Sequence, residues 1–158
     1  MERRSRYPGT RPFSDTEEDR RLFFGRSEET DRLFLRVLSV DLLVLFGRSG
    51  LGKSSLLRAG LFPRLRSKEY LPVTVRLNTP GEPLATAAAR GIDRACEAEG
   101  LDPPKVTAPD LRTLLGGTTI WREDLLLTPV LVLDQFEEVF TLHDAQFRHQ
   151  VATELGAL

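Results

Sequence analysis

One glycine-rich stretch carries the residues best suited to binding an anion. Residues 47–54 read GRSGLGKS and match the phosphate-loop (Walker A) pattern G-x-x-x-x-G-K-[ST] at every fixed position. Gly50 and Gly52 let successive backbone N–H groups converge on one phosphate, and the positive end of the following helix adds to that field. Lys53 is expected to reach the β- and γ-phosphates, and Ser54 to place its hydroxyl on Mg²⁺. The residues that we expect to contact the cofactor, ATP or ADP with Mg²⁺, are Gly47, Arg48, Ser49, Gly50, Leu51, Gly52, Lys53, Ser54 and Ser55.

A second stretch supplies carboxylates. The apolar residues 130–133 run directly into Asp134, which is the arrangement of a Walker B strand, and Asp134 is expected to hold Mg²⁺ through a water. Glu137 and Glu138 follow within one helical turn, and either could activate the attacking water as a general base. We favour Glu137, because Glu138 could be an ordinary helix-surface acid, and both could simply complement a helix dipole. The predicted catalytic residues are thus Lys53, Glu137 and Glu138, and the predicted metal ligands are Ser54 and Asp134.

Strands that alternate with helices must position these residues. Continuous apolar runs predict buried strands at 41–46, 71–77 and 130–133, the first leading into the phosphate loop. A short helix is expected after Ser14, and further helical patterns are expected at 27–38, 53–59, 83–99, near 111, 136–140 and 146–155. The alternation predicts an α/β fold with a largely parallel sheet.

Several single residues sharpen this assignment. Ser14 with Glu17 reads as a capping box, and Gly60 with Pro63 is expected to stop the helix that follows the phosphate loop. Trp121 falls in a stretch without a clear pattern, where we expect a packing residue.

Composition narrows the class of protein. The chain has 158 residues, a formal net charge of −1 and 41% hydrophobic residues, which favours one compact domain without a general attraction to nucleic acid. The single cysteine, Cys96, excludes an internal disulfide and a multi-cysteine zinc site. No apolar run is long enough to span a bilayer and no signal peptide is apparent, so we expect a cytoplasmic protein without membrane contact.

Two polar groups have weaker functional interpretations. A basic cluster near the end of the phosphate-loop helix could touch nucleic-acid phosphates but is more typical of a solvated face. Its members are Arg58, Arg64, Arg66 and Lys68. His143 and His149 lie six residues apart, which does not suit two metal ligands on one helix face.

Four segments together resemble the novel STAND NTPase domain, a P-loop ATPase domain of signal-transduction proteins that are often bacterial. They are YPGTRPF, LFFGRSEE, the phosphate loop with LLRAGLFPRL after it, and VLDQFEEVF, spread from about residue 7 to residue 140. The resemblance implies a three-layer α/β/α sandwich with a mostly parallel sheet. It divides the chain into an N-terminal segment (1–26) and a partial P-loop NTPase core (27–158), with Walker A at 47–54 and Walker B at 130–134.

The resemblance also assigns roles that the residues alone do not. Gly25 and Arg26, with Phe24 nearby, are implied to lie near the adenine and ribose, whereas the residues alone predict only a helix end with a turn. Exchange of ADP for ATP is implied to reorganise the domains and permit assembly with protein partners or other copies.

The chain departs from the family pattern after Asp134. Only residues 135–158 follow, and the family's sensor strand, further strand, helical lid and winged-helix region are not apparent. Without the sensor strand, the strands at 41–46 and 130–133 are expected to leave a gap or to pair directly in a small three-stranded sheet. We therefore expect a core truncated after the Walker B strand and helix, either a fragment, a shortened reading frame or half of an assembly.

Three functions compete on this sequence. The first is an ATPase switch that binds Mg·ATP, hydrolyses it slowly and assembles with partners. The second is a nucleotide- or partner-binding module without turnover. The third is a small-molecule kinase, for which an arginine-bearing lid and an acceptor pocket are expected and neither is apparent. The N-K-x-D motif of GTPases is absent, which favours ATP over GTP.

Overall fold

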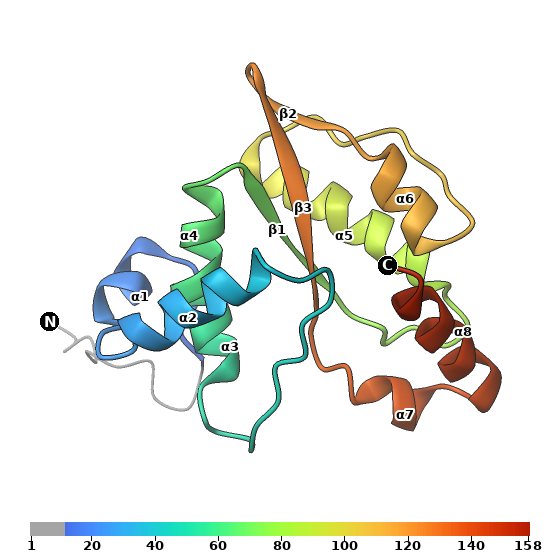
Figure 1. Ribbon diagram of the computed structural model, residues 1–158, viewed down its shortest axis with the longest axis horizontal. Coiled ribbons are helices and arrows are strands. Elements are labelled where there is room, and N and C mark those ends of the chain that lie inside the picture. Colours follow the sequence, from blue (N-terminus) through green and yellow to red (C-terminus); the bar gives the residue numbers. More distant parts are fainter. Residues whose placement is uncertain (1–11) are drawn as a thin grey trace, which may run out of the picture. The chain divides into compact units, whose positions relative to one another are not determined.

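The computed structural model describes residues 12–158 and divides the chain into two compact units, Met1–Lys68 and Glu69–Leu158. Figure 1 gives the order of the elements, and each unit is described here by itself. Tyr7 to Arg11 of the predicted YPGTRPF segment lie outside the described residues. Within residues 12–158, no helix combines the length and apolar character needed to cross a membrane.

The first helix of the N-terminal unit begins differently from the prediction. α1 runs over Glu17–Leu22 and its N-cap is Thr16, whose side chain accepts a hydrogen bond from the backbone N–H of Asp19. Ser14 is therefore not the cap. Its backbone N–H and its hydroxyl both donate to the buried carboxylate of Asp19. The Ser14 hydroxyl is therefore engaged with Asp19, and Thr16, two residues later, caps the helix.

The second helix matches the prediction and packs closely on the helix that follows the phosphate loop. α2 covers Ser27–Val37, with Glu28 and Glu29 in its first turn. Its buried Thr30 lies against Gly60, where an added Cβ would come within 2.7 Å of the Thr30 hydroxyl oxygen. Gly60 is thus required by the close approach of two helices.

The helix after the phosphate loop does not stop at Gly60 and Pro63, so that prediction was wrong. It continues through α3 (Lys53–Ser55), a π-helical segment η1 (Leu56–Leu61) and α4 (Phe62–Arg66). In η1 the backbone N–H of Phe62 donates to Leu57, five residues back. The wider π turn accommodates Pro63 at the start of α4, because a proline ring clashes with the carbonyl four residues back in a regular helix.

The strand predicted at 41–46 does not form. Residues 42–48 have no regular secondary structure, and the five apolar side chains from Leu42 to Phe46 are 38–87% exposed. Among the described residues every strand lies in the C-terminal unit, so within its own unit this segment has no strand to pair with. Without a neighbouring strand, the backbone N–H and C=O groups of an extended segment cannot form inter-strand hydrogen bonds, whatever its composition.

The C-terminal unit contains one small mixed sheet among the described residues, with strand order β1-β3-β2. β1 (Tyr70–Val75) pairs in parallel with β3 (Leu125–Leu133), in the register Val73 to Leu131 and Val75 to Leu133. The short β2 (Ile120–Arg122) pairs antiparallel with the start of β3. The α/β class is confirmed, but this sheet is small and only one of its two pairings is parallel.

One face of this sheet carries the core of the unit. α5 (Leu84–Glu99) packs along β1 (Figure 1), and its Gly91 lies so close that an added Cβ would be 3.1 Å from both Val73 and Val75. α6 (Leu111–Gly117) and α8 (Ala145–Gly156) extend the same core, whereas the short α7 (Glu138–Leu142) follows β3. Leu131 and Leu133 pack against this core from β3.

Three details of the C-terminal unit differ from the prediction. β3 begins five residues earlier than 130, and residues 130–133 are half-buried where full burial was predicted. The helix predicted at 136–140 begins at Glu138, since residues 134–137 form a turn. Trp121 lies in β2 and is 56% exposed, because its neighbour Ile120 takes the buried face.

Candidate functional site

The phosphate-loop segment, residues 47–54, forms a tight backbone turn ahead of α3. Gly50 and Gly52 have φ angles of 82° and 76°, in the left-handed region that side chains with a Cβ disfavour. A Cβ on Gly50 would meet no atom within 4 Å, so glycine is needed there for conformation alone. A Cβ on Gly52 would also approach a guanidinium nitrogen of Arg26 to 2.9 Å. Because the Arg26 guanidinium is the end of a flexible side chain, the backbone conformation is the main reason for glycine at both positions.

Lys53 lies across this loop. Its Nζ donates to the carbonyl oxygens of Gly47, at 2.7 Å, and of Arg48, at 3.2 Å. An ammonium has three donors and a flexible stem, so these carbonyls hold the charge at the loop without fixing it permanently. A phosphate that entered the loop would offer the ammonium a stronger, charge-assisted acceptor.

Arg26 connects the Gly25-Arg26 motif to the phosphate loop. One guanidinium nitrogen donates to the carbonyl oxygen of Leu51 at 2.8 Å, and Nε pairs with Glu29. The hydrogen bond from Arg26 lowers the pKa of Glu29, with smaller contributions from the charges of Arg26 and Arg32. Gly25, with φ of 82°, allows the turn that precedes α2. The structure thus brings together two motifs that the sequence separates by more than twenty residues.

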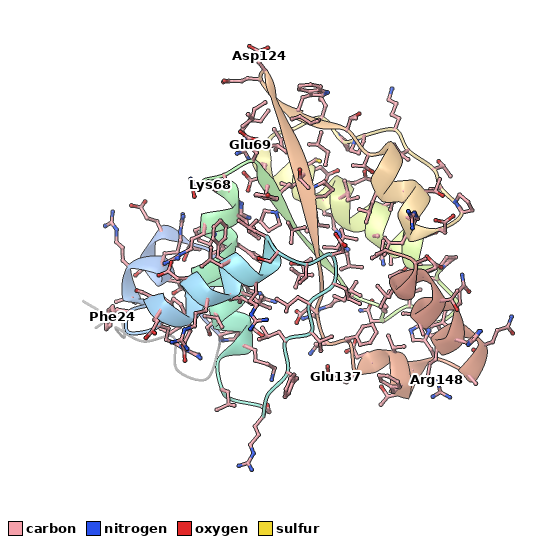
Figure 2. All side chains as sticks on the ribbon, viewed as in Figure 1. Phe24, Lys68, Glu69, Asp124, Glu137 and Arg148 are labelled. Atoms are coloured by element: carbon pink, nitrogen blue, oxygen red, sulfur yellow. The ribbon has the colours of Figure 1, made fainter. Side chains whose placement is uncertain are left out.

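The two serines after Lys53 have different surroundings. Ser54 is half-buried at the start of α3. Ser55 is buried, and its hydroxyl accepts a hydrogen bond of 3.0 Å from the backbone N–H of Phe13. Ser55 therefore anchors the segment before α1, and its cofactor contact stays a prediction. Phe24, labelled in Figure 2, is 64% exposed beside the motif.

In the C-terminal unit, Asp134 stands at the end of β3 beside Arg76 at the end of β1. The backbone N–H of Asp134 donates to the carbonyl of Val75 at 2.9 Å, which extends the strand pairing by one residue. A guanidinium nitrogen of Arg76 donates to Oδ2 of Asp134 at 3.2 Å. Arg76 is not among the residues predicted from the sequence. A charged residue near the end of the strand predicted at 71–77 was a usable signal, but the pairing of that strand with the Asp134 strand was not visible.

The turn after Asp134 distinguishes the two glutamates. Gln135 has φ of 57°, a strained conformation for a residue with a Cβ, and it reverses the chain toward α7. Glu137 is exposed at the N-cap of α7 (Figure 2). Glu138 is half-buried, and its Oε2 is enclosed with no hydrogen-bond partner among the described residues. A buried carboxylate oxygen without a partner is costly, which makes Glu138 the more unusual of the two acids.

The two predicted metal ligands, Ser54 in the N-terminal unit and Asp134 in the C-terminal unit, each have the chemistry that Mg²⁺ prefers. Mg²⁺ prefers hard oxygen ligands and usually takes one or two from the protein, with phosphate oxygens and waters completing the shell. The hydroxyl of Ser54 and the carboxylate of Asp134 are of that kind. Among residues 12–158, no group of three His, Cys, Asp or Glu side chains is gathered as an all-protein metal cage. Each of these oxygen donors, taken by itself, therefore suits a metal that arrives with its nucleotide.

The comparison with protein families agrees with this chemistry. Residues 7–158 match the family described as Novel STAND NTPase 1. The chain belongs to this family. No curated protein and no solved structure matches the chain.

Other polar groups of this STAND NTPase domain are engaged in the fold. Arg64 pairs with Asp31 and Arg66 with Asp15, all within the N-terminal unit. His143 donates through Nε2 to the carbonyl oxygen of Leu77 at 2.6 Å and stacks on Phe147.

A hollow of about 200 Å³ lies elsewhere, between α5, the loop of residues 101–110 and α6. None of the predicted site residues lines it. This hollow therefore has no part in the candidate nucleotide site.

Proposed function

We propose that this STAND NTPase domain binds Mg·ATP and Mg·ADP through the phosphate-loop segment. The observation that carries the proposal is the loop itself, in which left-handed glycines at 50 and 52 accompany a lysine held at the loop carbonyls. Membership of the novel STAND NTPase 1 family supports the same conclusion. Gly47 to Ser55 would bind the phosphates, and Gly25 with Arg26 would lie toward the adenine and ribose.

The proposed metal ligands are Ser54 and Asp134. Bound Mg²⁺ would neutralise charge on the phosphates and polarise the bond to the γ-phosphate. Lys53 would bind the β- and γ-phosphates, which it can reach by exchanging its loop carbonyls for phosphate oxygens. The family's mostly parallel, three-layer P-loop sandwich is part of the same proposal.

Glu138 becomes a stronger candidate than Glu137 for the general base. Its enclosed, unsatisfied Oε2 needs a polar partner, and a water positioned for attack would be one. Glu137 is exposed, and its position at the N-cap of α7 is already explained by the helix dipole. Glu138→Gln should therefore abolish most turnover while nucleotide binding remains, and Glu137→Gln should retain turnover.

The biological role proposed is that of a cytoplasmic signalling switch, of the bacterial type. ATP in place of ADP would favour assembly with protein partners or with other copies of the chain. This role rests on the family and on the nucleotide site together.

Calorimetric titration of ATP and ADP, with Mg²⁺ and with EDTA, tests the binding step. Saturable binding that is lost in Lys53→Ala and kept in Lys68→Ala is expected, since both lysines belong to the N-terminal unit and only Lys53 contacts the loop. A folded wild-type protein that binds neither nucleotide would refute the proposal.

A second candidate is a nucleotide- or partner-binding module without turnover. The exposed apolar segment Leu42 to Phe46 favours it, because the strand expected to support the phosphate loop is not formed. Phosphate release assays separate the two candidates. Binding without release in wild type, unchanged in Glu138→Gln, would select the module.

A further inference from the structure

Arg76 and Asp134 are brought together by strand register alone. β1 ends at Val75 and β3 at Leu133, and these two residues are partners in the parallel pairing. The next residues along each strand, 76 and 134, therefore emerge side by side at the same edge of the sheet. The hydrogen bond from the Asp134 N–H to Val75 continues the ladder to this point, so both backbones are fixed.

The two side chains of this pair differ in their access to water. The Asp134 side chain is 17% exposed and that of Arg76 is 46% exposed. An enclosed carboxylate depends on a nearby cation or hydrogen bonds, whereas a half-exposed guanidinium loses little when it returns to solvent. The contact between Nη2 of Arg76 and Oδ2 of Asp134 is 3.2 Å long, which exceeds the roughly 2.7–2.9 Å of a strong charge-assisted hydrogen bond.

The backbone next to Arg76 is held from a third side. The buried His143, which follows α7, donates to the carbonyl oxygen of Leu77 at 2.6 Å. A change at Arg76 is therefore confined to its side chain, and the strand ends keep their places. This arrangement leaves a mobile cation on a fixed carboxylate.

We infer that Arg76 is a positioning residue that neutralises Asp134 in the metal-free protein and leaves it when Mg·nucleotide binds. The inference rests on the proposed function, in which Asp134 is a metal ligand. The guanidinium donates to the same carboxylate that would accept from the metal or its water, so the two cations compete. Arg76 thus orients the Asp134 side chain, and it sets how strongly Mg²⁺ improves nucleotide affinity.

The experiment compares the affinity for ATP in Mg²⁺ with that in EDTA, for wild type, Arg76→Gln, Arg76→Lys and Arg122→Gln. The ratio of the two affinities should rise roughly two- to fivefold in Arg76→Gln, the range expected on losing a partly exposed ion pair. Arg76→Lys should restore a ratio near wild type. Arg122→Gln, which removes an ion pair with Glu99 in the same unit, should leave it unchanged.

Two results would overturn the inference. One is an unchanged ratio in Arg76→Gln. The other is a weaker affinity of Arg76→Gln for ATP in EDTA, which would make Arg76 a direct phosphate ligand. In both cases loss of binding in Lys53→Ala would still uphold the proposed function.

Mn²⁺ without nucleotide gives an independent reading. Paramagnetic broadening of the Gln135 amide signal should begin at a lower Mn²⁺ concentration in Arg76→Gln than in wild type. Equal Mn²⁺ dependence would overturn the competition even if the wild type bound no ATP. Absence of ATP binding by itself would refute the proposed function and, with it, the role assigned to Arg76 at the nucleotide site.

Discussion

Two apolar segments of similar composition differ in secondary structure and in burial in this protein. DLLVLF, residues 41–46, is irregular, and its apolar side chains are largely exposed. YLPVTV, residues 70–75, forms β1, with Leu71, Val73 and Val75 completely buried. The more apolar of the two segments is the one that remains exposed.

The difference lies in what each segment contacts within its own unit. β1 has β3 as a hydrogen-bonding partner and α5 as a cover over its inner face. Within the N-terminal unit, the described residues offer residues 42–46 no strand to pair with. Burial of apolar side chains is favourable for both segments, but a strand also requires a neighbouring strand that hydrogen-bonds to its backbone.

Hydrogen exchange should give the largest contrast between these segments. Amides of β1 that pair with β3 can exchange only when the unit opens, whereas amides of 42–46 are exposed in the native state. We expect protection to differ by roughly 10³-fold or more, given a typical domain stability. Slow exchange across residues 42–46, measured by mass spectrometry, would contradict the comparison.

Truncating one leucine in each segment should change the free energy of unfolding by very different amounts. Leu71→Ala should lower the free energy of unfolding by about 2–5 kcal/mol, because it leaves a cavity in the core. Leu42→Ala should change it by less than about 0.5 kcal/mol. Urea unfolding followed by circular dichroism gives both values.

The buried thiol of Cys96 gives a reading specific to the C-terminal unit, because burial raises its pKa and it reacts only on opening. Leu71→Ala should speed its reaction with a thiol reagent, and Leu42→Ala should not. An equal cost of the two truncations would mean that Leu42 is buried in solution.

Substitutions at two glycines test whether the packing of α5 on β1 stabilises the C-terminal unit. Gly91→Ala places a methyl group 3.1 Å from Val73 and Val75 and should destabilise the C-terminal unit by about 1–3 kcal/mol. Gly116→Ala is the matched control in α6, where an added Cβ meets nothing and should stabilise by up to about 1 kcal/mol. Similar thermal unfolding of both variants would show that α5 yields at this contact.

Acid pH should produce the smallest effect, with one carboxylate in each unit. The backbone N–H of Thr113 donates to Asp110 at 2.8 Å and lowers the pKa of that carboxyl. The side chain of Arg26 donates a hydrogen bond to Glu29 and lowers its pKa. A lowered pKa adds stability above the unfolded value, and this stability is lost as the pH falls through the folded value.

Two substitutions assign these acid contributions. Asp110→Asn should make the stability of the C-terminal unit less dependent on pH in that range, and Glu29→Gln should do so for the N-terminal unit. Carboxyl NMR titration of the wild type checks both pKa values. An ordinary value for either group would remove its contribution.

The sequence by itself determined the features that depend on neighbours along the chain. These include the start of α2 at Ser27, the end of α5 before Gly100 and the glycine positions of the phosphate loop. It also determined the family, because the phosphate-loop and DQFEE segments are local patterns. Local backbone chemistry is sufficient for such features, since the residues that decide them lie within one or two turns.

The tertiary structure decided every feature that depends on a distant partner. Three features can be predicted only when it is known which segments lie side by side. They are the exposure of residues 42–46, the contact of Arg26 with Leu51 and the pairing of Arg76 with Asp134. The close approach of Gly60 to Thr30 is another case, because these two residues lie on different helices. Strand pairing and close packing are properties of two segments at once, so no single segment of this sequence could reveal them.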